Sequence, residues 1–133
     1  MTAPTRVAVV GAAGYAGGEL VRLLAGHPSV EIASVHARGR AGTPLAAELP
    51  HLAPLGLKFR DDEPDDVEVA FLALPHGASA QLAARLLERG ATVIDIGADF
   101  RLRDADAYAT WYGALHPSGA PRRRCVRADR VEP

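Results

Sequence analysis

Three glycines recur at intervals of three in this 133-residue chain, at Gly11, Gly14 and Gly17. They follow an apolar run at residues 7–10 and precede a helical pattern with an apolar face at residues 20–24. In that context glycines let the backbone approach a pyrophosphate closely, and the free N–H groups at the helix start face the anion. We therefore predict a phosphate cradle. It consists of Gly11, Ala13, Gly14, Tyr15, Ala16 and Gly17.

The spacing of this glycine turn is Gly-x-x-Gly-x-x-Gly, which departs from the commoner Gly-x-Gly-x-x-Gly but keeps its mechanics. The alternative interpretation is that the glycines only allow a helix to pack tightly on a strand. Strand, turn and helix all fall where a phosphate site needs them, which favours the cradle.

Two arginines stand where a dinucleotide-binding unit distinguishes its coenzymes. After the second predicted strand the chain reads His36-Ala37-Arg38-Gly39-Arg40. An acidic residue at that place binds the 2′-hydroxyl of NAD, whereas an arginine accommodates the 2′-phosphate of NADP. Because this segment holds two forked cations and no acid, we predict NADP as the cofactor, with Arg38 and Arg40 among its binding residues. The alternative is that both are ordinary surface arginines.

Leu74, Pro75 and His76 follow the end of a further predicted strand. Open parallel sheets bind ligands beyond the carboxyl ends of their strands, so we predict that these three residues lie near the nicotinamide. A histidine after proline is more often an ordinary loop residue than a catalyst. We therefore assign no catalytic residue in this chain.

An acidic run, Asp61-Asp62-Glu63-Pro64-Asp65-Asp66, separates two predicted elements. We interpret it as a solvated surface bend. A metal site is not predicted, because nothing in the run indicates a fixed coordination geometry.

Strand and helix patterns alternate along the chain and predict an α/β fold, a Rossmann-like doubly wound parallel sheet that is incomplete. The stretch at 37–58 is predicted as a loop with one helical turn at 45–49. The strands are expected at residues 6–10, 30–36, 67–74 and 91–96, and the helices at 14–25, 79–89 and 104–111.

Length and composition indicate one domain and restrict its partners. The net charge of −1 and the isoelectric point near 6.5 argue against nucleic acid. No apolar run is long enough for a membrane span, and the first residues lack a secretory signal, so we expect a cytoplasmic protein. The single cysteine, Cys125, excludes an internal disulfide.

The residues after 117 differ in kind from those before them. They show no helix or strand period, and five arginines are crowded among them. We predict a nucleotide-binding domain at residues 1–117 and a disordered tail at 118–133. The alternative is a basic tail that binds nucleic acid. Its short length, its two acids and its lack of aromatic residues argue against that alternative.

Four segments, at residues 11–20, 71–77, 97–102 and 111–113, resemble N-acetyl-gamma-glutamyl-phosphate reductase in order and spacing. The resemblance extends over residues 6–116 and implies an NADPH-dependent enzyme of arginine biosynthesis, related in fold to aspartate-semialdehyde dehydrogenase. Such an enzyme reduces N-acetylglutamyl phosphate to N-acetylglutamate semialdehyde and releases phosphate. The resemblance also implies that Asp99, Phe100 and Arg101 lie near a domain junction, and it is compatible with a homo-oligomer.

The family's reaction uses a cysteine nucleophile in an Asn/Val-Pro-Gly-Cys-Tyr-Pro-Thr segment, which lies beyond the last residue of this chain. Cys125 has no glycine turn before it and no helix pattern after it, so we do not expect it to be that nucleophile. We expect that the substrate domain is absent and that the chain is inactive alone. Codons for residues 124–133, read one base forward, permit a family-like sequence, so we expect a frameshift near residues 117–122.

Two other functions stay open. One is the related reductase that acts on a carrier-bound aminoadipyl phosphate in lysine biosynthesis, because the glycine turn and residues 74–77 do not exclude it. The other is a free-standing NADP-binding regulatory module, for which a C-terminal segment that completes a pocket would be the discriminating feature.

Overall fold

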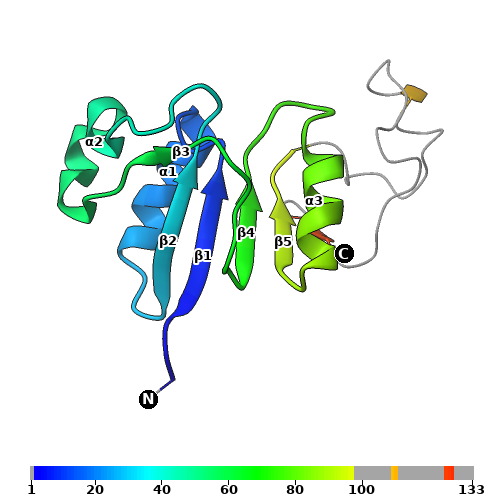
Figure 1. Ribbon diagram of the computed structural model, residues 1–133, viewed down its shortest axis with the longest axis horizontal. Helices are drawn as coiled ribbons and strands as arrows, with labels where there is room; N and C mark the ends of the chain where they lie inside the picture. Colours follow the sequence, from blue (N-terminus) through cyan, green and yellow to red (C-terminus); the bar gives the residue numbers. More distant parts are fainter. Residues whose placement is uncertain (1, 98–108, 111–124, 128–133) are drawn as a thin grey trace.

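β1 (Thr5–Val10) lies in the middle of a sheet whose strand order is β3-β2-β1-β4-β5-β6. The structure is a computed structural model, and it describes residues 2–97, 109–110 and the backbone of 125–127. All neighbouring strands are parallel, which confirms the predicted Rossmann-like fold (Figure 1). The other strands are β2 (Val30–His36), β3 (Phe59–Arg60), β4 (Val69–Leu72), β5 (Thr92–Asp95) and β6 (Cys125–Arg127).

Helices cover both faces of this sheet. Val9 packs in a cluster with α1 (Tyr15–Ala25), whereas the next residue, Val10, packs in a cluster with α3 (Ser79–Glu88). Because successive residues of a strand point to opposite faces, α1 and α3 lie on opposite sides, as Figure 1 shows. The strand order reverses between β1 and β4, and this switch point is where open α/β sheets bind ligands.

The segment between β2 and β4 is more structured than predicted. The helical turn expected at residues 45–49 is present as α2 (Leu45–Glu48), but a 3₁₀ helix, η1 (Pro50–Leu55), and β3 were not predicted. The prolines of η1 suggested a loop, although proline is compatible with the first turn of a helix. β3 has only two residues, too few to show an alternation of apolar and polar side chains. Its Phe59 is buried and packs in the core cluster under α1.

β6 lies within the segment predicted as a disordered tail, and this short strand was not predicted. Cys125 pairs with Val93 and Arg127 pairs with Asp95, in parallel register. The edge of β5 offers backbone N–H and C=O groups that a three-residue strand satisfies without any hydrophobic period. The rest of the predicted tail lies outside the described residues. So do Asp99, Phe100, Arg101 and the helix predicted at 104–111, except for Ala109 and Thr110, which are helical.

None of the helices in the described ranges has the length and apolar character that crossing a bilayer requires.

Candidate functional site

The glycine turn joins β1 to α1 through backbone hydrogen bonds. Gly11 has a φ of +84°, which favours glycine, and the N–H groups of Gly11 and Ala12 both donate to the carbonyl of His36, at 2.9 and 3.1 Å. Gly14 is the N-cap residue of α1 and donates to the carbonyl of Gly11 at 3.1 Å. No side chain caps this helix and its first turn contains no acid, so the helix start offers N–H groups to an anion.

The three glycines of the turn serve different purposes. A Cβ on Gly11 would lie 2.2 Å from the carbonyl oxygen of Ala73, and a Cβ on Gly17 would lie 2.1 Å from that of Gly11. These two positions require glycine for close packing. A Cβ on Gly14 would have its nearest neighbour at 3.5 Å, which is an ordinary contact. The fold alone therefore does not explain Gly14.

A groove of about 480 Å³ opens above this turn, at the switch point between β1 and β4. It brings together ten of the eleven residues that we predicted to bind the cofactor. These are Gly11, Ala13, Gly14, Tyr15, Ala16, Gly17, Arg38, Arg40, Leu74 and Pro75. His76 is exposed and does not line the groove, so its place near a nicotinamide stays a prediction.

A second groove, of about 610 Å³, continues from the first. The two share five lining residues, Gly11, Ala37, Arg38, Leu74 and Pro75, while the second is also lined by residues of the acidic turn and of α3. An extended ligand along the carboxyl ends of the strands would occupy both, as a dinucleotide does in folds of this kind.

The two candidate arginines differ in their surroundings. Arg40 forms an ion pair with Glu48 of α2. Arg38 is exposed, lines both grooves, and forms no ion pair with any residue in the described part of the chain. The sequence does not distinguish the two arginines, because Arg40 and its partner Glu48 are eight residues apart and no local pattern indicates their contact.

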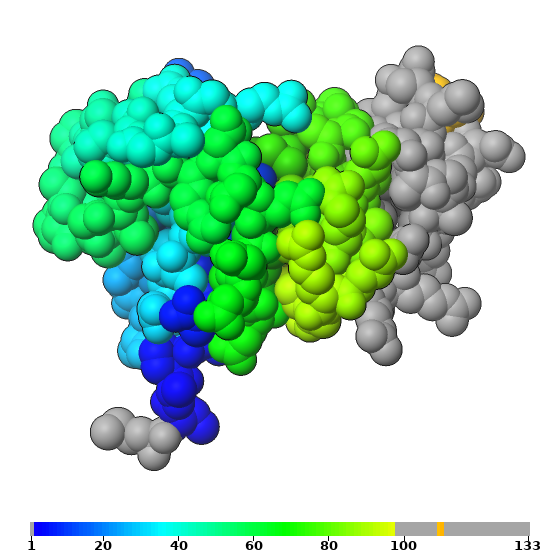
Figure 2. Space-filling model, viewed as in Figure 1, coloured from blue at the N-terminus to red at the C-terminus, as the bar shows by residue number. Residues whose placement is uncertain are grey.

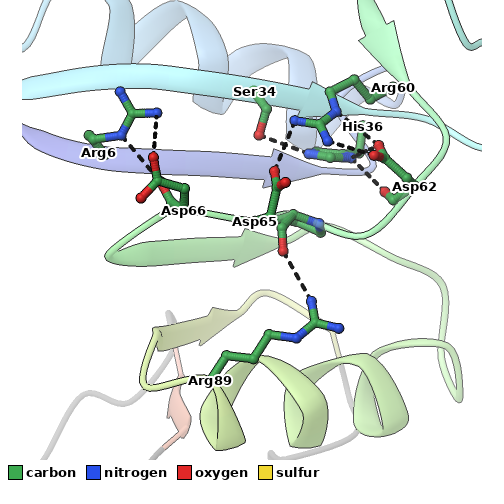
Figure 3. Close-up of polar contacts among 9 residues, drawn as sticks. Arg6, Ser34, His36, Arg60, Asp62, Asp65, Asp66 and Arg89 are labelled. Carbon is green, nitrogen blue, oxygen red and sulfur yellow. Dashed lines mark hydrogen bonds and ion pairs between the residues drawn. The ribbon is translucent and has the colours of Figure 1, made fainter.

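The imidazole of His36 is buried on the α3 face of β2, where Figure 3 shows it between Ser34 and Asp62. Its Nδ1 lies 2.8 Å from the carbonyl oxygen of Asp62, and its Nε2 lies 2.8 Å from Oγ of Ser34. Since a carbonyl only accepts, Nδ1 carries the proton and Ser34 donates to Nε2. Burial lowers the pKa of His36 and so favours the neutral ring. Through its hydrogen bond to Asp62, the ring links the acidic turn to β2.

The acidic turn is not merely a solvated bend, because all five of its acids have partners. Asp61 accepts the N–H of Gly39 at 3.1 Å, and Asp66 lies 3.5 Å from Arg6. The remaining contacts join Asp62 and Asp65 to Arg60, and Glu63 to Arg85 and Arg89. Several of these partners are more than twenty residues away in sequence, so no local pattern indicates them.

Figure 2 shows the green segment between β3 and α3 over the middle of one face. Figure 3 shows three acids of this segment directed at side chains of three strands: Asp66 at Arg6 of β1, Asp62 at His36 of β2, and Asp65 at Arg60 of β3. Among the residues that the structure describes, no three His, Cys, Asp or Glu side chains come together as a metal site requires.

His36 is expected to make stability depend on pH. Its folded-state pKa lies below the ordinary value of 6.5, so below that pH the unfolded chain takes up a proton that the folded chain resists. The free energy of unfolding should therefore fall as the pH is lowered through 6.5, and it should fall less steeply in His36→Gln. Urea titrations at several pH values on both sides of 6.5 measure the free energy of unfolding, and His51→Gln is the control variant. Equal slopes for His36→Gln and the unmodified chain would contradict this role.

The geometry defines a dinucleotide-binding domain of the Rossmann type, and comparison with known proteins agrees. The chain belongs to the semialdehyde dehydrogenase NAD-binding domain family, which matches residues 6–121. Within it the chain is 54% identical to the N-acetyl-gamma-glutamyl-phosphate reductase of Acidothermus cellulolyticus over an alignment of 132 positions, which covers 93% of this chain and 38% of that protein. The resemblance noted from the sequence is thereby confirmed. The chain spans about a third of the length of the curated relatives that it matches.

Solved structures support the fold. Aspartate semialdehyde dehydrogenase with NADP from Candida albicans aligns with a TM-score of 0.69 at 18% identity, over 94% of this chain and 42% of that one. GenD2 from gentamicin A biosynthesis, in complex with NAD, aligns with a TM-score of 0.62 at 20% identity, over 96% of this chain and 35% of that one. One neighbour holds NADP and the other NAD, so the fold alone does not choose the coenzyme.

Proposed function

We propose that this chain is the NADP-binding portion of an N-acetyl-gamma-glutamyl-phosphate reductase. The observation that carries the proposal is the groove above the glycine turn, which gathers ten residues singled out for this purpose from the sequence alone. Gly14 lines this groove and has no side chain to obstruct it. Arg38 also lines the groove, and it has no ion-pair partner among the described residues.

Each part of the site has a chemical task in this proposal. The N–H groups at the start of α1 bind the pyrophosphate, since they combine free donors with the positive end of the helix dipole. Arg38 pairs with the 2′-phosphate through its planar fork. Leu74 and Pro75 form an apolar wall, and His76 stands on the nicotinamide side. NADPH, when bound, supplies the hydride that reduces an acyl group to an aldehyde.

The substrate of the whole reductase is proposed to be N-acetylglutamyl phosphate, after the relatives that the chain matches. The aminoadipyl phosphate reductase stays the alternative, and the cytoplasmic location stays a prediction. We propose that this chain binds nucleotide without turnover, because none of its residues is assigned as the nucleophile. Phosphate-dependent reduction of NADP by the purified chain with the aldehyde substrate would contradict that assignment.

Arg38→Ala is expected to weaken NADPH binding about tenfold to a hundredfold and to leave NADH binding unchanged, because a charge-assisted pair contributes about 1.5–3 kcal/mol. Arg40→Ala should have a smaller effect, since Glu48 already pairs with that cation. Fluorescence titration with both nucleotides measures the ratio of affinities. Arg22→Ala on α1 is the control, because Arg22 pairs with Glu19 away from the groove. Loss of NADPH and NADH affinity in equal measure would refute recognition of the 2′-phosphate by Arg38.

A further inference from the structure

The loop at residues 37–42, between β2 and α2, presents Arg38 to the grooves, and its two ends form hydrogen bonds with β3. Ala37 donates to the carbonyl of Arg60 at 3.0 Å, and Gly42 donates to that of Phe59 at 2.9 Å. Arg40 closes the turn by donating to the carbonyl of Ala37 at 3.2 Å. The backbone of the loop ends is therefore fixed by the sheet.

The tip of this loop is held differently. Gly39 has a φ of +71°, and a Cβ placed on it would find nothing within 4 Å, so the tip is not packed against other groups. The N–H of Gly39 donates to Oδ2 of Asp61 at 3.1 Å. A charge-assisted hydrogen bond thus holds a segment that packing leaves free.

Asp61 reaches the loop from the acidic turn, whose own position is well determined. The neighbouring Asp62 accepts from Arg60 at 2.9 and 2.5 Å, and its carbonyl accepts from the buried ring of His36. The contacts of Asp62 therefore fix the backbone next to Asp61, although the hydrogen bond between Gly39 and Asp61 is itself exposed to solvent.

We propose that Asp61 is a positioning residue for coenzyme selectivity, which holds the amide of Gly39 so that the adjacent Arg38 faces the 2′-phosphate. This inference rests on the proposed function, since it assigns the selectivity of the same site. Arg38 has no ion-pair partner in the described part of the chain, so no acidic side chain there holds its guanidinium, and the loop backbone sets the point from which it reaches the grooves. A shift at Gly39 moves the guanidinium away from the groove and weakens NADPH binding selectively.

Three variants test the role of Asp61, with the NADPH-to-NADH affinity ratio as the readout. Asp61→Ala should lower the ratio about fivefold to tenfold, as expected for the loss of one solvent-exposed hydrogen bond that acts on Arg38 indirectly. Asp61→Asn should keep the ratio within about twofold, because the amide oxygen accepts the same N–H. Asp65→Ala removes an acid of the same turn that pairs with Arg60 and should also keep the ratio.

The outcomes separate positioning from other roles. An unchanged ratio in Asp61→Ala would overturn the proposal. A ratio that rises equally in Asp61→Ala and Asp61→Asn would overturn it too, because Asp61 would then act by repelling the 2′-phosphate. If the unmodified chain binds neither nucleotide, the proposed function fails together with this inference, whereas normal binding with an unchanged Asp61→Ala ratio removes the inference alone.

Discussion

Gly14→Ala is expected to weaken NADPH binding about a hundredfold while lowering the free energy of unfolding by no more than about 1.5 kcal/mol, the cost of a poorer N-cap. The added Cβ meets no atom closer than 3.5 Å within the protein, and alanine can adopt the extended backbone of Gly14, although it is a poorer N-cap residue than glycine. The methyl group enters the space where a pyrophosphate approaches the helix start, and it disrupts hydrogen bonds to the anion that contribute about 1.5–3 kcal/mol each. Nucleotide titration and urea denaturation measure the two quantities.

Gly26→Ala provides the matched control for this change. Gly26 lies at the other end of α1, far along the chain from the groove, and a Cβ there would come within 3.8 Å of the carbonyl oxygen of Leu23. NADPH affinity should be unaffected. If Gly14→Ala binds NADPH as tightly as the unmodified chain does, the glycine turn is a packing device and not a phosphate cradle.

Gly11→Ala and Gly17→Ala are expected to destabilise the fold itself, by about 3–5 kcal/mol each. Each Cβ would lie within 2.2 Å of a backbone carbonyl oxygen, which does not move aside as a side-chain end does. Gly11 also has a φ of +84°, which costs alanine about 1–2 kcal/mol more. Urea denaturation gives the loss directly, and failure to yield folded protein is the extreme of the same outcome.

Gly18→Ala is the comparison for these two variants. Its Cβ would meet the end of the flexible Leu49 side chain at 3.2 Å, so the cost should stay near about 1 kcal/mol. Equal stability of Gly11→Ala, Gly17→Ala and Gly18→Ala would show that the turn tolerates side chains that its geometry excludes.

Local signals predicted the part of the fold that carries the site. The apolar run at β1, the glycines and the helical period of α1 are adjacent in sequence, and they fold against one another. η1 and β3 escaped prediction because prolines obscure the first and two residues carry no period in the second. β6 was also not predicted, because three residues carry no period. Its pairing with the edge of β5, more than its own sequence, makes this segment a strand.

Within the site, the sequence identified residues but not their division of tasks. Gly11 and Gly17 serve close packing and Gly14 does not, a difference that depends on the carbonyl oxygens of Ala73 and Gly11. Arg40 is neutralised by Glu48, which leaves Arg38 as the cation offered to the groove among the described residues. Such distinctions arise from contacts made in three dimensions, which spacing along a chain does not encode.

Titration of the unmodified chain with NADPH, and in parallel with NADH, tests the nucleotide site most directly. A saturable signal with tighter binding of NADPH is expected, because Arg38 offers an ion pair that only the 2′-phosphate uses. Equal affinity for the two nucleotides would contradict the assignment of NADP, and the absence of binding by a folded chain would contradict the site.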